Sequence, residues 1–410
     1  MSRVRGGLGV ALALATIAAF SMPAVASSAA TLPDVAVGGV SHRAVCTPGP
    51  AGTARCHAHV VTGRDGVTPR ASSSYPLGAY GPAQLRGAYG LTTNSTATVA
   101  IVDAFQNPNV VSDLAAYRSA TGLPACAFGT CFRVLNQNGG TSLSSVPNNT
   151  GWGQEIDLDV EMVSAVCPGC NIVLVEANSN YYSDLGTAVI TAKNLSGVVA
   201  VSNSYGGGEW SGETAYDGAY TPPSGKVITV SSGDSGYGVE YPAASNKVVA
   251  VGGTSLTLTS GNARASETAW SGAGSGCSAV EGKPGYQTDT GCGRRTVADV
   301  SAVADPNTGV AVYDSYGSSG GANWYQFGGT SVAAPIIATV FALANNGAGA
   351  GYPYSHTSSL YDVTTGSNGR CTFGGNPHKV SSSTAAYLCT AGTGYDGPTG
   401  LGTPKGTAAF

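Results

Sequence analysis

The sequence has 410 residues, of which 42% are hydrophobic, 10% are charged and 60 are glycine. That hydrophobic fraction excludes disorder caused by low hydrophobicity and high charge, and a coiled coil is excluded because it needs dense Glu, Lys and Leu repeats. The formal net charge of −4 indicates no basic surface for binding nucleic acid. The low charge and the even number of cysteines, 10, favour a secreted protein with disulfide bonds.

The N-terminus has the pattern of an export signal. Arg3 and Arg5 precede an apolar run at residues 8–20, and the small residues at 24–26 form a cleavage site. The run is too short to span a membrane. We therefore expect residues 1–26 to be a signal peptide and the mature chain to be extracellular, with no membrane segment.

The composition changes near residue 75. Residues 27–75 are rich in small residues and proline, and they contain three of the five histidines. We interpret them as a short N-terminal pro-like segment. Because no linker or internal repeat follows, we predict one large domain over residues 76–410.

Apolar strands alternate with helices along this domain. In chain order the pattern predicts strands at 96–104, 171–176, 197–202, 227–231 and 248–251, and helices at 110–120, 152–166, 184–193 and 331–345. Continuous apolar strands separated by helices are typical of an α/β protein whose doubly wound, mostly parallel sheet has helices on both faces. Residues 254–330 are mostly loop-like, and loops of that length are often functional.

The cysteines fall in couples that are close in the sequence. Sequence alone does not determine their connectivity, but we expect each cysteine to pair with its neighbour. Cys167 and Cys170 also have the spacing of a redox motif, although a structural disulfide is the expected interpretation in an exported chain. The expected pairs are Cys46–Cys56, Cys126–Cys131, Cys167–Cys170, Cys277–Cys292 and Cys371–Cys389.

The positions of the histidines restrict the chemistry. No histidine occurs between Tyr75 and Ala350, whereas Ser–His–Asp hydrolases, HExxH zinc peptidases and Cys–His peptidases all need one. His356 and His378 have no recognisable motif around them, and we interpret them as structural or surface residues. If the protein is a hydrolase, we expect its general base to be a carboxylate.

Ser331 is the strongest candidate nucleophile. It begins an apolar helical segment, where free backbone N–H groups can hold a developing oxyanion. A helix N-cap is an equally good interpretation of that position. Ser235 imitates the chymotrypsin signature without the upstream histidine of those β-barrels, and Ser319 matches GxSxG without the required strand and helix around it.

Acidic residues are concentrated on the second predicted helix. Glu155 and Asp159 are four residues apart and share one face, and Asp157 and Glu161 form a second such pair. Apolar residues surround both pairs, which is typical of a buried helix, and no Lys or Arg occurs in residues 134–192. Such carboxyl pairs can share a proton. The spacing does not distinguish one pair from the other, or exclude a solvent-facing acidic helix.

Two further aspartates end predicted strands. Asp234 follows the strand at 227–231, at the edge of the sheet where sites gather in such folds, although a Gly-Asp-Ser-Gly turn is the simpler interpretation. Asp103 ends the strand at 96–104, where subtilisin-like enzymes place their catalytic aspartate. Because no subtilisin histidine motif accompanies Asp103, we interpret it as structural.

Taken in order, these motifs resemble those of the sedolisins, the serine-carboxyl peptidases. That family resembles subtilisin in fold but replaces its histidine with a glutamate. The resemblance extends from about residue 80 to residue 404 and implies a subtilisin-like fold. It includes residues 202–206, which are similar to the strand along which the substrate backbone lies.

The resemblance assigns roles to the candidate residues. Residues 155–159 are similar to the family's E-x-x-L-D motif, which implies that Glu155 is the general base and that Asp159 tunes it. The Gly-Thr-Ser motif implies that Ser331 is the nucleophile. The loop around Asp234 implies that this aspartate, when protonated, donates a hydrogen bond to the oxyanion.

Two C-terminal segments, residues 361–366 and 392–396, resemble the family's calcium site. They imply one structural calcium ion with six or more oxygen ligands, of which one would be a water. The expected protein ligands are the carboxylates of Asp362 and Asp396 and the backbone carbonyls of Val363, Gly392 and Gly394.

We therefore expect a secreted, monomeric endopeptidase that cleaves protein or peptide substrates at acid pH. One departure from the family concerns activation, because sedolisins usually carry a folded prosegment far longer than residues 27–75. Two alternatives remain. One is a neutral subtilisin-like protease that uses Asp103 with His356 or His378, and the other is a catalytically silent secreted binding protein on the same fold.

Overall fold

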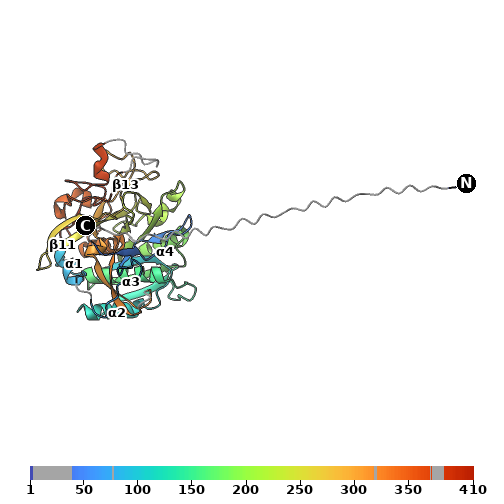
Figure 1. Cartoon of the computed structure of the whole chain (residues 1–410), viewed down its shortest axis with the longest axis horizontal. Helices are drawn as coiled ribbons and strands as arrows, with labels where there is room; N and C mark the ends of the chain where they lie inside the picture. Colours follow the sequence, from blue (N-terminus) through green and yellow to red (C-terminus); the bar gives the residue numbers. More distant parts are fainter. Residues whose placement is uncertain (3–38, 76–77, 318–320, 370, 372–382) are drawn as a thin grey trace. The chain divides into compact units, whose positions relative to one another are not determined.

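The computed structural model (Figure 1) describes residues 1–2, 39–75, 78–317, 321–369, 371 and 383–410. The expected signal peptide lies outside these residues apart from its first two, and Ser319 and His378 lie outside them as well. Within the described part of the chain, no helix combines the length and the hydropathy that crossing a bilayer requires.

A mainly parallel sheet forms the centre of the protein. Its strands follow continuous apolar runs, and every residue of β4 (Thr98–Ala104) is buried. The neighbours of β4, which are β6 and β7, both run parallel to it. The strand order is β12 (Arg264–Ala269), β11 (Val249–Leu258), β9 (Val227–Ser231), β7 (Val198–Asn203), β4, β6 (Asn171–Ala177) and β5 (Phe132–Asn136), and β15 (Val300–Val303) also pairs with β11.

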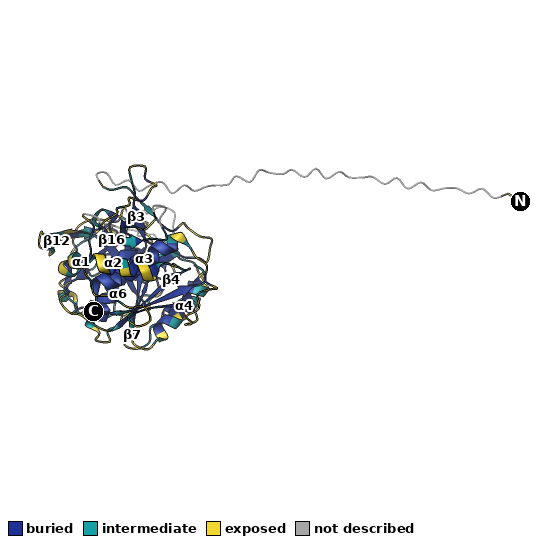
Figure 2. Ribbon diagram, turned by 90° about the horizontal axis from the view of Figure 1, so that it is seen from below, coloured by how far each residue is buried: buried dark blue, intermediate teal, exposed yellow. Residues whose placement is uncertain are grey.

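Helices cover both faces of this sheet. On one face, α3 (Thr150–Val166) packs against α6 (Thr330–Ala344), with α1 (Pro82–Ala88) and α2 (Val110–Ala120) beside α3. On the other face, α4 (Tyr182–Asn194) packs on β4 and β6, next to the short α5 (Asp217–Tyr220). Figure 2 shows α6 in dark blue, whereas α2 and α4 have yellow, exposed outer surfaces. The predicted α/β fold and its helices are confirmed.

Strands from residues 39–75 form two smaller sheets together with strands from later parts of the domain. Their backbone groups pair with segments that lie some 150 to 270 positions later in the chain. The first sheet has the order β1 (His42–Ala44), β3 (His59–Val61), β17 (Asn323–Gly328) and β16 (Val310–Asp314), and the second has β10 (Glu240–Tyr241), β8 (Tyr205–Gly208) and β2 (Arg55–Cys56).

Residues 254–330 lie mostly outside regular elements, as expected, but they contain several strands that the sequence pattern did not predict. The end of β11 and the whole of β12, β15, β16 and β17 lie within them. These strands are short and mix Ser, Thr, Gln and Gly with apolar residues, so they lack the long apolar runs of the central strands. The remaining strands form two small pairs, β13 (Gly276–Cys277) with β14 (Thr296–Val297) and β18 (Leu360–Tyr361) with β19 (Thr403–Pro404). Short 3-10 helices occur at Glu213–Tyr216, Pro306–Thr308, Pro353–Ser355, Thr357–Ser359 and Ser383–Leu388.

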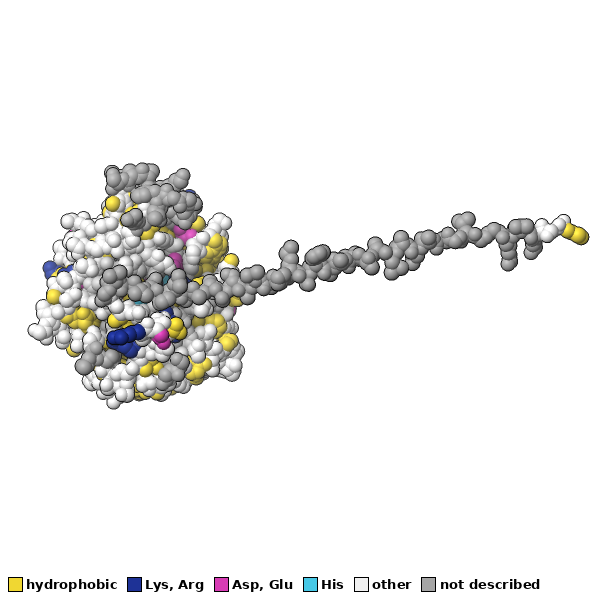
Figure 3. All heavy atoms as spheres, in the orientation of Figure 1, with side chains coloured by type: hydrophobic (Ala, Val, Ile, Leu, Met, Phe, Trp, Pro, Cys, Tyr) yellow, Lys and Arg dark blue, Asp and Glu magenta, His cyan; other side chains and the backbone are white. Residues whose placement is uncertain are grey.

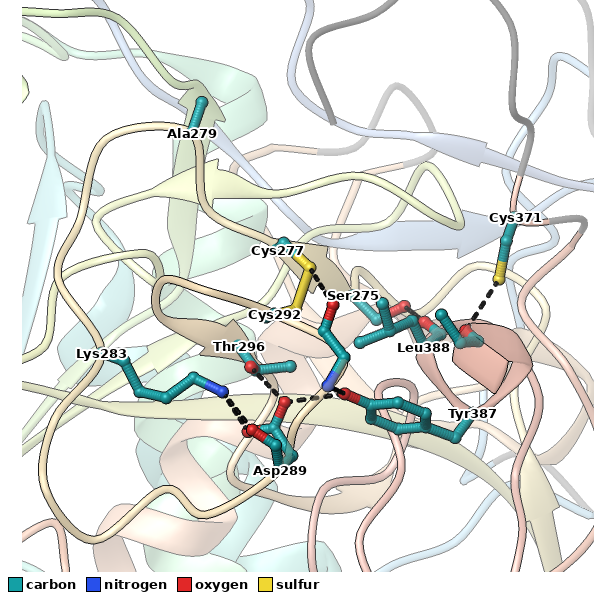
Figure 4. Close-up of a disulfide and its surroundings, with 12 residues drawn as sticks. Ser275, Cys277, Ala279, Lys283, Asp289, Cys292, Thr296, Cys371, Tyr387 and Leu388 are labelled. Carbon is teal, nitrogen blue, oxygen red and sulfur yellow. Dashed lines mark hydrogen bonds and ion pairs between the residues drawn. A yellow bond between two sulfur atoms is a disulfide. The ribbon is translucent and has the colours of Figure 1, made fainter. Parts of the chain in front are cut away.

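All five expected disulfides are present, which confirms pairing between neighbours. Figure 4 shows the Cys277–Cys292 bridge and the loop that it closes. Inside this loop, Asp289 accepts hydrogen bonds from Lys283, Thr296 and Tyr387. Covalent and polar links therefore hold a segment that has little regular structure.

Charged side chains are sparse on the surface, as the face in Figure 3 shows. Several cationic groups are also fastened to backbone carbonyls. The ammonium group of Lys193 donates to the carbonyls of Gly218 and Thr221. Lys226 donates to the carbonyls of Lys193 and Leu195. These cations are therefore held against the protein rather than extended into solvent.

Candidate active site

Ser331 is positioned by the junction between β17 and α6. Gly329, with a φ of +102°, is the N-cap residue of α6, so Ser331 does not cap the helix. The Ser331 hydroxyl donates to the carbonyl oxygen of Ser204 at 3.3 Å. A Cβ at Gly329 would lie 1.9 Å from the carbonyl oxygen of His57. Glycine is therefore needed here both for its backbone conformation and for the close approach of another chain segment.

Ser204 connects the helix of Ser331 to the acidic helix α3. Its hydroxyl donates to Asp159 Oδ1 at 2.8 Å and lies 3.4 Å from the carbonyl oxygen of Ser331. That carbonyl lacks its usual intrahelical donor, because the residue four positions later is Pro335, which has no N–H. The predicted substrate strand at residues 202–206 thus lies directly beside the nucleophile candidate.

Glu155 and Asp159 lie on the side of α3 that faces Ser331, and both side chains are completely buried. Ser331 is close enough to Glu155 to favour its ionised form, and Glu155 is close enough to Asp159 to share a proton with it. Glu155 Oε2 accepts the N–H of Ala58 at 2.9 Å. Among the described residues, Oε1 has no hydrogen-bond partner. This oxygen is therefore free to accept a proton.

The second acidic pair of α3 points elsewhere. Glu161 Oε2 accepts the N–H of Tyr313 at 3.0 Å. Asp157 lies beside Asp113 and Asp314 in a separate buried carboxyl cluster. The packing of α3 thus brings Glu155 and Asp159 to Ser331 and keeps Asp157 and Glu161 away from it, a distinction that spacing alone does not make.

Burial raises the pKa of both Glu155 and Asp159 well above the ordinary range, and the neighbouring charge of Asp103 raises it further. The nearby Ser331 hydroxyl and the hydrogen bond from the Ala58 N–H act in the opposite direction and lower the pKa of Glu155. Carboxyl groups this close together in a dry interior cannot all ionise, so the cluster holds shared protons.

The interpretation of Asp103 as merely structural missed its place in this cluster. Asp103 is the next-to-last residue of β4, on which α3 packs. It is completely buried, and neither of its oxygens has a hydrogen-bond partner among the described residues. Burial raises its pKa to about 8. An ionisable residue in an otherwise apolar strand was the available signal, but the sequence does not show that β4 lies beneath α3.

Asp234 follows β9 and faces the N-terminus of α6. Its Oδ1 accepts the backbone N–H of Thr330 at 2.8 Å and the Thr330 hydroxyl at 2.6 Å. Its Oδ2 has no hydrogen bond among the described residues. A Cβ added to Gly329 would lie 2.6 Å from this oxygen and 1.9 Å from the carbonyl oxygen of His57, so both oxygens lie close to Gly329. Burial raises the pKa of Asp234 to about 6, against the opposing charge of His57. Below that pH the carboxyl is neutral and Oδ2 can donate a hydrogen bond.

Two histidines from residues 39–75 lie in the site, and sequence reasoning missed both. His57 is 1% exposed and hydrogen-bonds to Ser231 and Glu240. His59 Nε2 lies 3.6 Å from Asp234 Oδ2. Burial, with neighbouring positive charges, lowers the pKa of His59 to about 3. No local pattern marks these residues, because long-range strand pairing brings them here.

The alternative that uses Asp103 with a C-terminal histidine gains no support. His356 stacks on Tyr352 and hydrogen-bonds to the carbonyl oxygen of the same residue. His378 lies outside the described residues.

The expected calcium ligands lie together at the C-terminus. Asp362 Oδ2 accepts the N–H of Gly394 at 2.9 Å, and Asp396 Oδ2 accepts the N–H of Gly392 at 3.1 Å. Asp396 is completely buried, and burial, with a further contribution from the charge of Asp362, raises its pKa to about 7. The other oxygen of Asp396, Oδ1, accepts the N–H and the hydroxyl of Thr399, both at 2.9 Å. Carboxylates and backbone carbonyls are oxygen donors of the kind that calcium prefers.

Comparison with known proteins now identifies the class. Residues 137–366 match the model of the subtilase family, Peptidase S8. The match spans more than half of the chain and includes all four candidate catalytic residues. The chain therefore belongs to the subtilase family.

Its relatives within that family are sedolisins, as the motifs indicated. Sedolisin of Pseudomonas sp. (strain 101) is 29% identical over 357 residues, covering 76% of this chain and 56% of the relative. Kumamolisin of Bacillus sp. (strain MN-32) is 29% identical over 292 residues, covering 62% and 49%. The chain thus spans about half the length of the curated relatives that it matches.

A solved structure gives the same result at the level of the fold. Pseudomonas sedolisin, a serine-carboxyl proteinase complexed with two molecules of pseudo-iodotyrostatin, superposes with a TM-score of 0.66 at 26% identity. The superposition covers 82% of this chain and 96% of that one. The predicted subtilisin-like fold and the resemblance to sedolisins are confirmed.

Proposed function

We propose that this chain is a secreted serine-carboxyl endopeptidase that hydrolyses protein or peptide substrates at acid pH. One observation carries the proposal. The Ser331 hydroxyl, at the start of α6, lies near the buried Glu155 of the Glu155–Asp159 pair, and the preceding residue, Thr330, binds the buried Asp234. The similarity to sedolisins supports this chemistry, and the signal-like N-terminus and the five disulfides support export.

The proposed mechanism follows from the protons and hydrogen bonds that each group can give or accept. Glu155 removes the proton from the Ser331 hydroxyl as the oxygen attacks the carbonyl carbon of the substrate. Neutral Asp234 donates a hydrogen bond to the oxygen that becomes negative. When the C–N bond breaks, Glu155 returns the proton to the leaving amine. Water then attacks the ester carbonyl carbon and loses a proton to Glu155. The bond between that carbon and Ser331 Oγ breaks, Glu155 returns the proton to Oγ, and the product leaves as a carboxylic acid.

The pH dependence follows from Asp234. Its pKa, raised by burial to about 6, keeps its carboxyl neutral in acid. Above that pH it ionises and repels the oxyanion. A histidine base would already be protonated at about pH 4, whereas a carboxyl pair that shares one proton still has a basic oxygen there. We therefore expect activity in acid that declines as the pH rises through about 6.

The first test is a pH–rate profile on an unfolded protein substrate, from about pH 2 to 9. Ser331→Ala and Glu155→Gln should each abolish turnover while leaving the thermal midpoint close to that of the wild type. Ser235→Ala, at another of the candidate serines, is the matched control and should retain activity. A neutral optimum, or turnover surviving in Ser331→Ala, would contradict the assignment.

We also propose that one calcium ion stabilises the C-terminal segment through Asp362, Asp396 and the carbonyls of Val363, Gly392 and Gly394. Calcium that binds only the folded state raises the unfolding temperature. A chelator should therefore lower the thermal midpoint of the wild type by several degrees. Asp396→Asn should abolish that response. A midpoint that is unchanged by chelator and by added calcium would rule out the site.

A further inference from the structure

Residues 55–58 lie along the predicted substrate strand as a bound peptide would. Arg55 pairs with Gly206, and Cys56 pairs with Tyr205, in antiparallel register. The N–H of His57 then continues the ladder to the carbonyl oxygen of Ser204 at 3.2 Å. Addition of a strand to a free sheet edge is a general way in which proteins hold extended peptides, with main-chain bonds setting the register.

This register places the peptide bond between His57 and Ala58 at the reacting groups. The His57 carbonyl oxygen lies next to Gly329 and to Asp234 Oδ2, where an oxyanion would be stabilised. The Ala58 N–H donates to Glu155 Oε2 at 2.9 Å, where a leaving amine would receive its proton. The carbonyl and the nitrogen of one bond thus face the two groups that the proposed mechanism requires on either side of the scissile bond.

The side chain of His57 consequently marks the pocket for the residue that supplies the scissile carbonyl. The imidazole is buried, with Nδ1 2.7 Å from Ser231 Oγ and Nε2 2.8 Å from Glu240 Oε2. Space for it exists because Gly206 has no side chain, since a Cβ there would lie 2.9 Å from the imidazole Cε1. The polar groups that meet the His57 side chain are therefore a hydroxyl and a carboxylate.

Glu240 is kept ionised in this pocket. Burial alone would raise its pKa, but the charge of His57, and then that of Arg55, lowers the pKa below the ordinary range. Arg55 also approaches Glu240 Oε1 at 3.5 Å. The Glu240 side chain is 14% exposed. A largely buried carboxylate that is satisfied by cationic partners becomes costly when an apolar side chain takes their place.

We propose, on the basis of the proposed function, that residues 55–58 occupy the substrate cleft in cis and that Glu240 makes the adjoining pocket selective for a cationic side chain, His, Lys or Arg, before the scissile bond. The chain's own His57 is the model for that side chain. A substrate with Leu at this position covers the Glu240 carboxylate without giving it a partner, and a substrate with Glu meets direct repulsion.

The test of selectivity uses two peptides that differ only in having Arg or Leu at the position before the scissile bond, with the cleaved bond located by mass spectrometry. The wild type should cleave the Arg peptide with a kcat/KM at least about 10-fold higher. Glu240→Gln should reduce that ratio to less than about 3-fold, mainly by slowing cleavage of the Arg peptide. Glu209→Gln, in a nearby carboxylate that binds Ser278 instead, is the control and should keep the wild-type ratio.

Occupancy of the cleft is tested separately by changing the occupant. His57→Glu places a second carboxylate against Glu240 and should expel residues 55–58, which raises kcat/KM on peptides added in trans. His57→Gln keeps a neutral side chain that can hydrogen-bond and should raise it much less. Equal activity in both variants and the wild type would overturn the claim that these residues fill the cleft.

The outcomes also separate this inference from the proposed function. Cleavage of both peptides at equal rates by the wild type, or a preference for Arg that survives in Glu240→Gln, would overturn the selectivity while leaving the peptidase assignment intact. If no variant, including His57→Glu, cleaves any peptide between about pH 2 and 9 although each is folded, the proposed function itself is wrong, and the inference falls with it.

Discussion

At the scale of single residues, the two carboxyl oxygens of Asp234 have different surroundings, and we expect one to have a structural role and the other a catalytic one. One oxygen holds the first residue of α6 through two hydrogen bonds from Thr330. The other has no hydrogen bond among the described residues and, in the proposed mechanism, faces the carbonyl oxygen of the substrate. The first arrangement persists whether or not the carboxyl is ionised, whereas the second requires a proton. Ionisation should therefore stop catalysis without releasing the loop.

Asp234→Asn separates these two functions. An amide can accept from Thr330 through its oxygen and donate from its nitrogen at every pH. We expect kcat/KM at pH 4 to fall about 10-fold, because the amide is a weaker donor, and the decline near pH 6 to disappear. Parallel pH profiles of variant and wild type measure both effects. A decline that remains near pH 6 in Asp234→Asn would mean that another group sets this limb.

At the scale of elements, the sequence predicted what continuous apolar patterning encodes. β4, α3 and α6 lie within two residues of their expected bounds, because each is apolar on nearly every side and is buried as a result. The neighbouring cysteines also pair as expected, since short separations leave few alternatives. The motif residues Glu155, Asp159 and Ser331 could be chosen from a resemblance before any geometry was known.

What the sequence did not reveal depends on contacts between distant segments. β2 and β8 are about 150 residues apart, so nothing local shows that His57 enters the site. The proximity of Asp103 to Glu155 follows from the position of β4 under α3, which no spacing encodes. β16 and β17 are stabilised by pairing with each other and with β3, rather than by long apolar runs.

The Cys277–Cys292 loop gives a prediction at this scale. The bridge closes a separation of 15 residues, and loop entropy predicts a stabilisation of about 3 kcal/mol for such a loop. The double substitution Cys277→Ser/Cys292→Ser should lower the free energy of unfolding by about that amount in a denaturant titration. The matched control, Cys126→Ser/Cys131→Ser, removes a bridge with a separation of 5 and should cost about 2 kcal/mol. A larger loss in the control would contradict the entropic account.

At the scale of the whole molecule, buried carboxyl groups make stability depend on pH. Burial raises the pKa of Asp103 and of Glu176 to about 8 and that of Asp234 to about 6. Each group binds its proton more tightly in the folded state, so its contribution is fully present below the unfolded pKa near 4 and is lost as the pH rises through the folded value. His59, whose pKa is lowered by burial to about 3, acts in the opposite direction. The carboxyl groups outnumber it.

We therefore expect the thermal midpoint to be higher at pH 4 than at pH 8. Asp103→Asn cannot ionise and should reduce this difference by several degrees, which thermal unfolding at a series of pH values measures. The matched control is Asp305→Asn, since Asp305 already has hydrogen-bond donors in Ser255 and Asn307. A wild type that is more stable at pH 8 would contradict the argument.

If the cleft selects cationic side chains, the small number of Lys and Arg residues affects how readily one copy of the protein can cleave another. If the proposed function is correct, copies of the protein are possible substrates of one another. Of the 19 Lys and Arg residues, all but Arg3 and Arg5 of the expected signal peptide would then be points where the chain could be cut. Arg118 and Arg295 are buried, and the ammonium groups of Lys193 and Lys226 are fastened to backbone carbonyls. None of these four can enter a neighbour's cleft as an extended strand without local unfolding. Under the proposed selectivity, the low number of Lys and Arg residues and the restraint of these four would therefore limit cleavage of the protein by its own copies.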